Sequence, residues 1–189
     1  MDKKLAMGVL IGLILGILAG VETIQYAQAR ACPQPACLEK TEVIPISDRG
    51  YLPEAHKILQ NAENSIHMAM FELKYYEKFK NSSVNIIVED LIQASKRGVE
   101  VKIIVDEFSE KDNAYQTLKE NNIDIKMDPE NTTTHAKLII VDGKVVILGS
   151  TNLSFYGLEK NNEVNVVLIS RQAAEYYEKY FWKLWNGDS

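Results

Sequence analysis

Histidine and cysteine, which often build metal and redox sites, are scarce in this chain. Its 189 residues include three histidines and two cysteines. Two cysteines are too few for a structural zinc site within one chain, because such a site takes four ligands. An excess of positive charge is missing as well, since 21 basic residues stand against 26 acidic ones and the net charge is -5. This balance is unfavourable for tight binding of duplex DNA, because neutralisation of phosphates by lysine and arginine dominates such affinity.

The overall charge still allows a local basic groove, which is all that an enzyme acting on a phosphate polymer needs. Without the first 29 residues, 19 basic and 24 acidic residues remain, so the net charge is again -5. Six basic side chains could contribute to a groove, although such charges are more often simply solvated: Lys74, Lys78, Lys80, Lys96, Arg97 and Lys102. A hydrophobic content of 46% suffices for one domain with a substantial core.

The first 29 residues have the composition of an export segment. Lys3 and Lys4 precede an uncharged run over 5–21, and Ala27-Gln28-Ala29 matches a signal-peptidase site. The run is at the short limit for a membrane span, and its glycines recur every four residues, as in packed membrane helices. A cleaved signal peptide and an uncleaved membrane anchor therefore both remain open for 1–29. Either one places the rest of the chain outside the cytoplasm.

Residues 30–42 form a proline-containing linker whose two cysteines agree with export. Cys32 and Cys37 enclose the sequence Pro-Gln-Pro-Ala. In an oxidising compartment we expect them to close a small disulfide loop or to pair between two chains.

An alternation of strand and helix patterns predicts an α/β domain with a mixed sheet over 43–187. Strands are expected at 43–47, 65–71, 99–105, 123–126, 136–141, 144–148 and 163–169, and helices at 52–63, 84–97, 111–121 and 171–185. Residues 101–105 are apolar on both faces of their strand, so helices should cover both sides of the sheet. Residues 74–83 form a polar and aromatic loop. The aromatic residues of the last helix are interpreted first as core or dimer packing.

The spacing His135-x-Lys137-x4-Asp142, followed by Gly149-Ser150-x-Asn152, is the most informative pattern in the chain. Asp142-Gly143 separates two apolar runs and is a strong signal for a hairpin with a two-residue loop. In that register Ser150 pairs with His135 and Leu148 with Lys137. Because side chains alternate between faces, we expect His135, Lys137, Ser150 and Asn152 to share one face at one end of the hairpin.

This group of side chains suits an anionic phosphoryl group. An imidazole can attack phosphorus or transfer protons near neutral pH, while Lys137 and Asn152 supply donors to the non-bridging oxygens. Gly149 has no side chain to obstruct the approach. Asp142 falls in the turn at the far end of the hairpin from His135. We therefore interpret Asp142 as a turn former or salt-bridge partner and not as a catalytic acid.

Together with the flanking residues 96–107 and Asn162-Glu163, this pattern resembles the phospholipase D superfamily, whose signature is called the HKD motif. The region 43–187 is similar to the small nucleases of that superfamily that carry one motif per chain. The resemblance implies a mixed sheet flanked by helices and a phosphodiesterase that needs neither a metal nor another cofactor, with an endonuclease that hydrolyses DNA or RNA as the first expectation. A phospholipase acting on membrane lipids is the alternative activity, and a non-catalytic nucleic-acid or lipid binding module is a third.

The resemblance also implies a role for each residue of the site. His135 would be the nucleophile and form a covalent phosphohistidine, while Lys137 and Asn152 would hold the phosphate. Ser150 would assist on the same face. Glu163 would accept a hydrogen bond from the ring of His135 and fix its tautomer.

Only one copy of the motif is present, although the implied reaction uses two histidines. His56 and His67 are not followed by lysine two residues later, and they are expected to pack or to face solvent. The second half of the site must then come from another subunit. The expected partners are therefore a second copy of the chain in a two-fold dimer with the active site at its interface, a nucleic-acid substrate and, if 5–21 is an anchor, a membrane.

Overall fold

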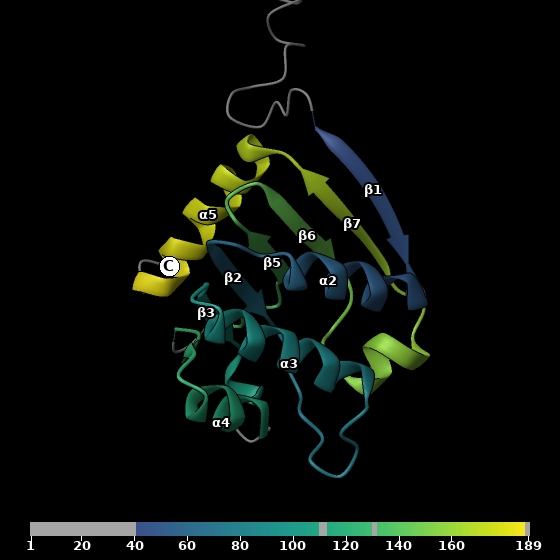
Figure 1. Cartoon of the computed structure of the whole chain (residues 1–189). Helices are drawn as coiled ribbons and strands as arrows, with labels where there is room; N and C mark the ends of the chain where they lie inside the picture. The colour runs from purple at the N-terminus through teal and green to yellow at the C-terminus, as the bar shows by residue number, and fades with distance from the viewer. Residues whose placement is uncertain (1–40, 110–112, 130–131, 188–189) are drawn as a thin grey trace, which may run out of the picture. The chain divides into compact units, whose positions relative to one another are not determined.

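A seven-stranded mixed sheet organises the part of the chain that the computed structural model describes, residues 41–109, 113–129 and 132–187 (Figure 1). Its strand order is β1-β7-β6-β5-β2-β3-β4. Strands β2, β3 and β4 run parallel to one another, and all other neighbours are antiparallel. The strands are β1 (Glu42–Ser47), β2 (Ser65–Met70), β3 (Glu100–Val105), β4 (Asp124–Met127), β5 (Lys137–Val141), β6 (Val145–Gly149) and β7 (Val164–Ile169).

Among the residues that the structure describes, four α-helices cover the two faces of the sheet. They are α2 (Tyr51–Gln60), α3 (Ser83–Lys96), α4 (Asn113–Glu120) and α5 (Arg171–Asn186), and the short helices are η1 (Asp48–Gly50), η2 (Glu107–Ser109) and the π-helix η3 (Tyr156–Lys160). Buried residues of α2, α3 and α4 share one hydrophobic cluster, whereas those of α5 belong to a second cluster on the opposite face. In Figure 1, α2 and α3 cross in front of the strands.

Local sequence explains where the last helix begins and ends. The Ser170 side chain accepts a hydrogen bond from the backbone N–H of Ala173, as an N-cap serine does. Gly187 ends the helix with a left-handed φ of 76°, a conformation that glycine adopts without steric cost. Phe181 of this helix is fully buried, whereas Tyr176 and Tyr180 are exposed. The aromatic residues of the last helix therefore serve partly as core.

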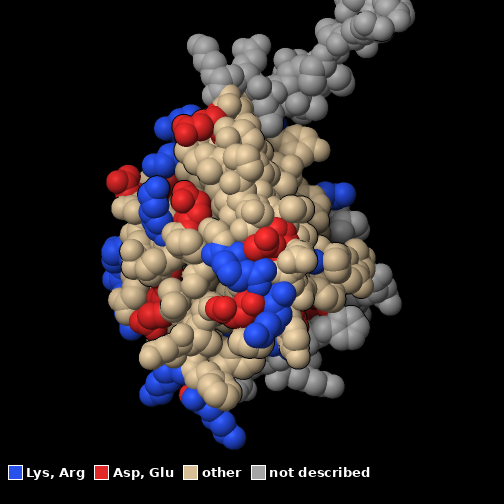
Figure 2. Space-filling view, turned by 90° about the vertical axis from the view of Figure 1, so that its right-hand side faces the viewer, with Lys and Arg blue, Asp and Glu red and all other residues tan. Residues whose placement is uncertain are grey.

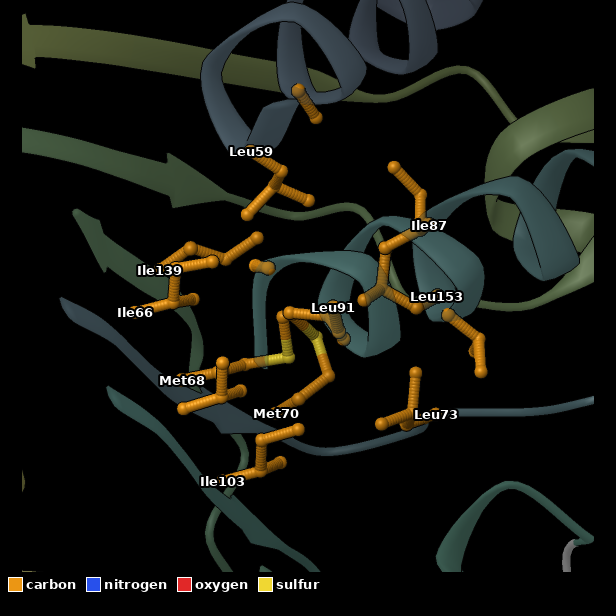
Figure 3. Packing of buried hydrophobic residues seen from close by; sticks show 14 of the residues in the cluster. Leu59, Ile66, Met68, Met70, Leu73, Ile87, Leu91, Ile103, Ile139 and Leu153 are labelled. Atoms are coloured by element: carbon orange, nitrogen blue, oxygen red, sulfur yellow. The ribbon is translucent and has the colours of Figure 1, made fainter. Parts of the chain in front are cut away.

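The larger hydrophobic cluster fills the space between the sheet and the pair α2 and α3. Ile66, Met68 and Met70 alternate along β2 toward this face, and Leu91 of α3 packs there (Figure 3). Leu73 and Leu153, both fully buried, extend the cluster beyond the ends of β2 and β6. The backbone at that end of the sheet is thereby fixed by packing.

The strands, the helices and the mixed sheet predicted from the sequence are confirmed, but the predicted hairpin register is wrong by one residue. Val141 pairs with Val145 and Leu138 with Leu148, so the loop between β5 and β6 has three residues, 142–144. Asp142 and Gly143 adopt positive φ angles of 53° and 57°. Continuing the observed register sets Lys137 opposite Gly149, and Ser150 follows the end of β6.

Asp142 holds this turn against the start of β2, which explains the longer loop. Its carboxylate accepts backbone hydrogen bonds from Glu63, Asn64 and Ser65, with the Asn64 bond 2.7 Å long. Lys144 lies 3.5 Å away and forms an ion pair with it. These long-range contacts place Asp142 as a turn former and salt-bridge partner, in agreement with the sequence.

The expectations for the N-terminal region lie outside the described residues. They concern the export segment 1–29, most of the linker 30–42 and the pairing of Cys32 with Cys37. Within the described ranges, no helix is both long and apolar enough to cross a membrane.

Candidate active site

His135 is exposed and lies in the irregular segment just before β5. Contacts on both sides hold this segment. The N–H of Thr134 donates to the Asp128 carboxylate at 2.7 Å, and the N–H of Phe71 donates to the Ala136 carbonyl at 2.9 Å. The ring of Phe71 packs on the imidazole with 4.5 Å between centroids. The ends of β2 and β4 thus position the histidine.

Lys137 points back at His135. Its Nζ atom lies 3.1 Å from Nδ1 and 3.2 Å from Nε2 of the imidazole, and it donates to the His135 carbonyl oxygen at 2.9 Å. The same atom lies 4.8 Å from the centroid of the Phe71 ring, in a cation–π contact. The ammonium therefore lies beside the imidazole, where an anionic phosphoryl group could contact both side chains.

Burial of the Lys137 ammonium lowers its pKa below the usual value for lysine. The negative charges of Glu163, Glu72 and Asp106 act in the opposite direction without cancelling this effect. Three carboxylates therefore surround one cation at this end of the sheet. Their field partly offsets the effect of burial and favours the charged form, which can bind a phosphate oxygen.

Ser150 and Glu163 form a hydrogen-bonded pair beside the end of β6. The Ser150 hydroxyl donates to the Glu163 carboxylate and accepts the N–H of Val164 at 3.1 Å. Asn161 donates to the other carboxylate oxygen at 3.0 Å, and the backbone N–H of Glu163 donates to Asp48 at 2.8 Å. The predicted bond from the His135 ring to Glu163 is not among the hydrogen bonds of the described residues. The role of Glu163 as an orienting carboxylate therefore stays a prediction.

Gly149 and Gly157 mark two close backbone approaches in the motif region. A Cβ on Gly149 would collide with the Val164 carbonyl and with Asn165 of β7, and one on Gly157 would collide with the carbonyl of Asn152. The physical requirement for Gly149 is therefore strand packing, whereas the sequence suggested room for the substrate.

Within the described part of the chain, the Asn152 Oδ1 atom is buried without a hydrogen-bond partner. This atom is a hydrogen-bond acceptor, so a phosphate oxygen would be bound by the Nδ2 group of the same side chain.

Sequence reasoning missed three residues at this site: Phe71, Glu72 and Asp106. Phe71 and Glu72 directly follow β2, and the fully buried Asp106 directly follows β3. Parallel strands bring their carboxyl ends to one edge of a sheet, where ligands bind in α/β folds. Polar residues directly after two apolar parallel strands were the signal that could have found Glu72 and Asp106.

The other two histidines pair with carboxylates away from the motif. His56 contacts Asp90 at 2.6 Å. The buried His67 contacts Glu178 at 2.7 Å and Glu100 at 3.2 Å. The expectation that both are packing or surface residues is confirmed. No cluster of three or more histidine, cysteine, aspartate or glutamate side chains that could hold a metal ion occurs in the ranges that the structure describes.

The site combines an exposed imidazole, a neighbouring ammonium, a serine and an amide at one edge of an α/β sheet. These groups suit the binding of an anionic ester. Comparison with known proteins identifies the family. Residues 56–185 match the family described as "Cardiolipin synthase, PLD-like domain". The chain therefore belongs to the PLD-like family of the phospholipase D superfamily, and this domain is a phosphodiester-hydrolase domain. The family and fold expected from the sequence are confirmed.

Individual relatives agree with this assignment. A phospholipase D from Rickettsia typhi is 35% identical over 127 residues, which cover 65% of this chain and 57% of that protein. The chain thus spans little more than half the length of this relative. Nuc from Salmonella typhimurium, a phospholipase D family member, superposes with a TM-score of 0.68 at 25% identity, covering 78% of this chain and 96% of Nuc. NucT from Helicobacter pylori superposes with a TM-score of 0.65 at 20% identity, covering 78% and 98%.

Proposed function

We propose that this protein is a metal-independent endonuclease that hydrolyses DNA or RNA with His135 as its nucleophile. The observation that carries the proposal is the Lys137 ammonium, which lies within 3.2 Å of both ring nitrogens of an exposed histidine. The likeness to the single-motif nucleases of the superfamily, and to Nuc over 96% of its length, supports nucleic acid as the substrate.

The reaction proceeds in two displacements. An imidazole nitrogen of His135 attacks phosphorus, an N–P bond forms, and the bond from phosphorus to the leaving oxygen breaks. A second histidine donates a proton to that oxygen. Water then gives up a proton to this histidine and attacks phosphorus, and the N–P bond breaks to release the product and free His135.

Other side chains stabilise the charge that develops on the phosphoryl group. Lys137 exchanges its contact with the imidazole for a charge-assisted hydrogen bond to a non-bridging oxygen, and Asn152 supplies a second polar contact. Ser150, held by Glu163, assists at the same end of the sheet. In this proposal Glu163 accepts a hydrogen bond from the ring of His135 and fixes its tautomer.

The second histidine comes from another copy of the chain in this proposal. The described domain offers His56 and His67 as alternatives, but both are engaged with carboxylates. A two-fold dimer that brings together two His135 side chains supplies the missing proton donor.

The test is cleavage of single-stranded and duplex DNA and of RNA by the full chain in excess EDTA. We expect cleavage to persist in the chelator and to fall by at least about 1,000-fold in His135→Ala, because removal of a nucleophile costs this much or more. His56→Gln, which can keep the contact with Asp90, serves as the matched control and should retain activity. Full activity of His135→Ala would refute the assigned nucleophile, and loss of cleavage in EDTA would refute metal independence.

Hydrolysis of membrane phospholipids is the second candidate, favoured by the relative from Rickettsia typhi that is named phospholipase D. The same preparations should be incubated with phosphatidylcholine vesicles, and release of choline should be measured. Choline release that depends on His135, without cleavage of nucleic acid, would select this activity instead.

We further propose that the catalytic domain acts outside the cytoplasm. The support is the sequence pattern of 1–29, with basic residues before an uncharged run. The mass of the protein recovered after export distinguishes a chain cut after Ala29 from one that keeps its anchor, and recovery in the cytoplasm alone would contradict the proposal.

A further inference from the structure

A groove of about 840 Å³ lies between the loop that follows β2 and the segment around η3. Its lining includes Tyr76, Lys78, Phe79, Lys80, Phe155 and Tyr156. Phe79 and Tyr156 are 69% and 68% exposed, although burial in the core is the usual fate of such rings. In Figure 1 the loop between β2 and α3 extends below the sheet, on the side where η3 lies.

Both walls of the groove follow residues of the candidate active site along the chain. The loop wall begins at Tyr76, five residues after Phe71, whose ring contacts His135, and the other wall begins at Phe155, three residues after Asn152. Leu73 and Leu153 join the two walls through an isolated β-bridge, and the N–H of Lys74 donates to the Leu153 carbonyl at 2.9 Å. Since consecutive Cα atoms are about 3.8 Å apart, Phe155 lies within about 11 Å of Asn152.

The loop wall has a defined conformation. The buried Asn85 of α3 accepts the N–H of Tyr76 at 2.9 Å and donates to the Tyr76 and Phe79 carbonyls at 3.0 and 3.3 Å. The Tyr76 hydroxyl accepts the N–H of Phe155 at 3.2 Å. The groove is thus positioned by hydrogen bonds to a helix of the core, which makes it a preformed surface.

Aromatic and basic side chains line this groove together, and the carboxylate of Glu159 lines it as well. Lys78 and Lys80 flank Phe79 in sequence, and the Lys160 ammonium lies 5.5 Å from the centroid of the Phe155 ring. Figure 2 shows basic side chains projecting at the lower end of the molecule, the level at which the loop lies in Figure 1. Interleaved rings and lysines are what a single-stranded nucleic acid requires, because its bases stack on rings while its phosphates meet cations.

We propose that this groove binds the unpaired bases of a single-stranded nucleic acid whose scissile phosphodiester lies at His135. The inference rests on the proposed nuclease function and narrows its substrate class. A duplex keeps its bases stacked on one another, so it cannot offer them to Phe79, Phe155 and Tyr156. Single strands are therefore preferred to duplexes. Lys78 and Lys80 supply local positive charge for a polyanion on a chain whose net charge is -5.

The test compares Phe79→Ala and Phe155→Ala with Tyr176→Ala, a control in which an exposed aromatic ring is removed from α5. Binding of a fluorescent oligothymidylate to each full-length protein is measured by anisotropy. The KM for cleavage of the same oligonucleotide is measured beside turnover of bis(p-nitrophenyl) phosphate, which is too small to reach the groove. Loss of one stacked base weakens binding by about 5-fold to 150-fold. We expect such a rise in Kd and KM for the two groove variants, unchanged turnover of the small ester and no change for Tyr176→Ala.

Three outcomes would overturn the inference. An unchanged Kd for oligothymidylate in both groove variants would show that no base stacks there. Loss of binding to phosphatidylglycerol vesicles with unchanged oligonucleotide binding would assign the groove to a membrane. Light scattering could show a lower molecular mass for the groove variants while oligothymidylate binding per dimer is unchanged. This result would assign the groove to an interface with a second copy of the chain. Failure of the proposed nuclease function is distinguishable, because the wild-type protein would then not cleave the oligonucleotide, while anisotropy still reports on the groove.

Discussion

At the scale of single residues, Asp142 shows how a member of a catalytic motif can act through structure. Burial alone would raise the pKa of its carboxyl, but the backbone hydrogen bonds from Asn64, Ser65 and Glu63 outweigh burial and lower it, with help from Lys144. A lowered pKa means that the carboxylate stabilises the fold above the pKa of the unfolded chain. This stabilisation is lost as the pH falls through the lowered value.

Asp142→Ala is therefore expected to destabilise the domain by about 1–3 kcal/mol at pH 7, because it leaves backbone donors at the start of β2 without their acceptor. Urea unfolding measures this change. Asp124→Ala is the control, since the Asp124 side chain is 70% exposed and its surface ion pair with Lys102 contributes little. Turnover lost in Asp142→Ala with unaltered unfolding would instead give Asp142 a catalytic role.

At the scale of elements, α5 is attached to the sheet by a buried histidine. His67 of β2 stacks on Phe181 with 4.8 Å between centroids and contacts Glu178 and Glu100. Burial by itself would lower the pKa of His67, but hydrogen bonds and charges from Glu178 and Glu100 together raise it above 6.5. The nearby Lys102 pairs with Glu100 and so limits the negative charge there.

Because this pKa is raised in the folded state, the pairing contributes fully below about pH 6.5 and its contribution falls as the pH rises through the folded value. Glu178→Gln should lower the stability by about 1.5–3 kcal/mol at pH 6 and by less at pH 9. Thermal unfolding at the two pH values checks this, with Glu175→Gln on an exposed position of α5 as the control. An equal loss at both pH values would contradict a charged histidine at this contact.

At the scale of the whole molecule, the site is expected to be complete only in a pair of chains. If both His135 side chains serve one active site, a dimer with one His135→Ala subunit is inactive. Refolding equal amounts of wild-type and His135→Ala chains together should then leave about one quarter of the activity of an all-wild-type sample, because random pairing makes a quarter of the dimers fully wild type. An activity of one half would indicate independent sites. His56→Gln chains mixed in the same way should leave activity unchanged.

Most of the fold could be predicted because it follows from local patterns of the amino-acid sequence. Hydrophobic periodicity located the strands and helices within about two residues at most ends, and the spacing from His135 to Asn152 identified the site and the family. The hairpin register could not be obtained in this way. It depends on Asp142 reaching backbone groups of 63–65, which are far from it in the sequence.

The sequence by itself determined the chemical groups of the candidate site and the α/β class, since these follow from residue types and short spacings. The second half-site from another chain is a prediction that comes from the family resemblance. Only the tertiary structure decided what surrounds those groups. Phe71, Glu72 and Asp106 meet Lys137 and His135 because β2, β3 and β5 are neighbours in the sheet. The tertiary structure also places the loop after β2 beside η3, and the two segments together form the aromatic groove. Such contacts join segments distant in the chain, and their energy depends on packing that no local pattern encodes.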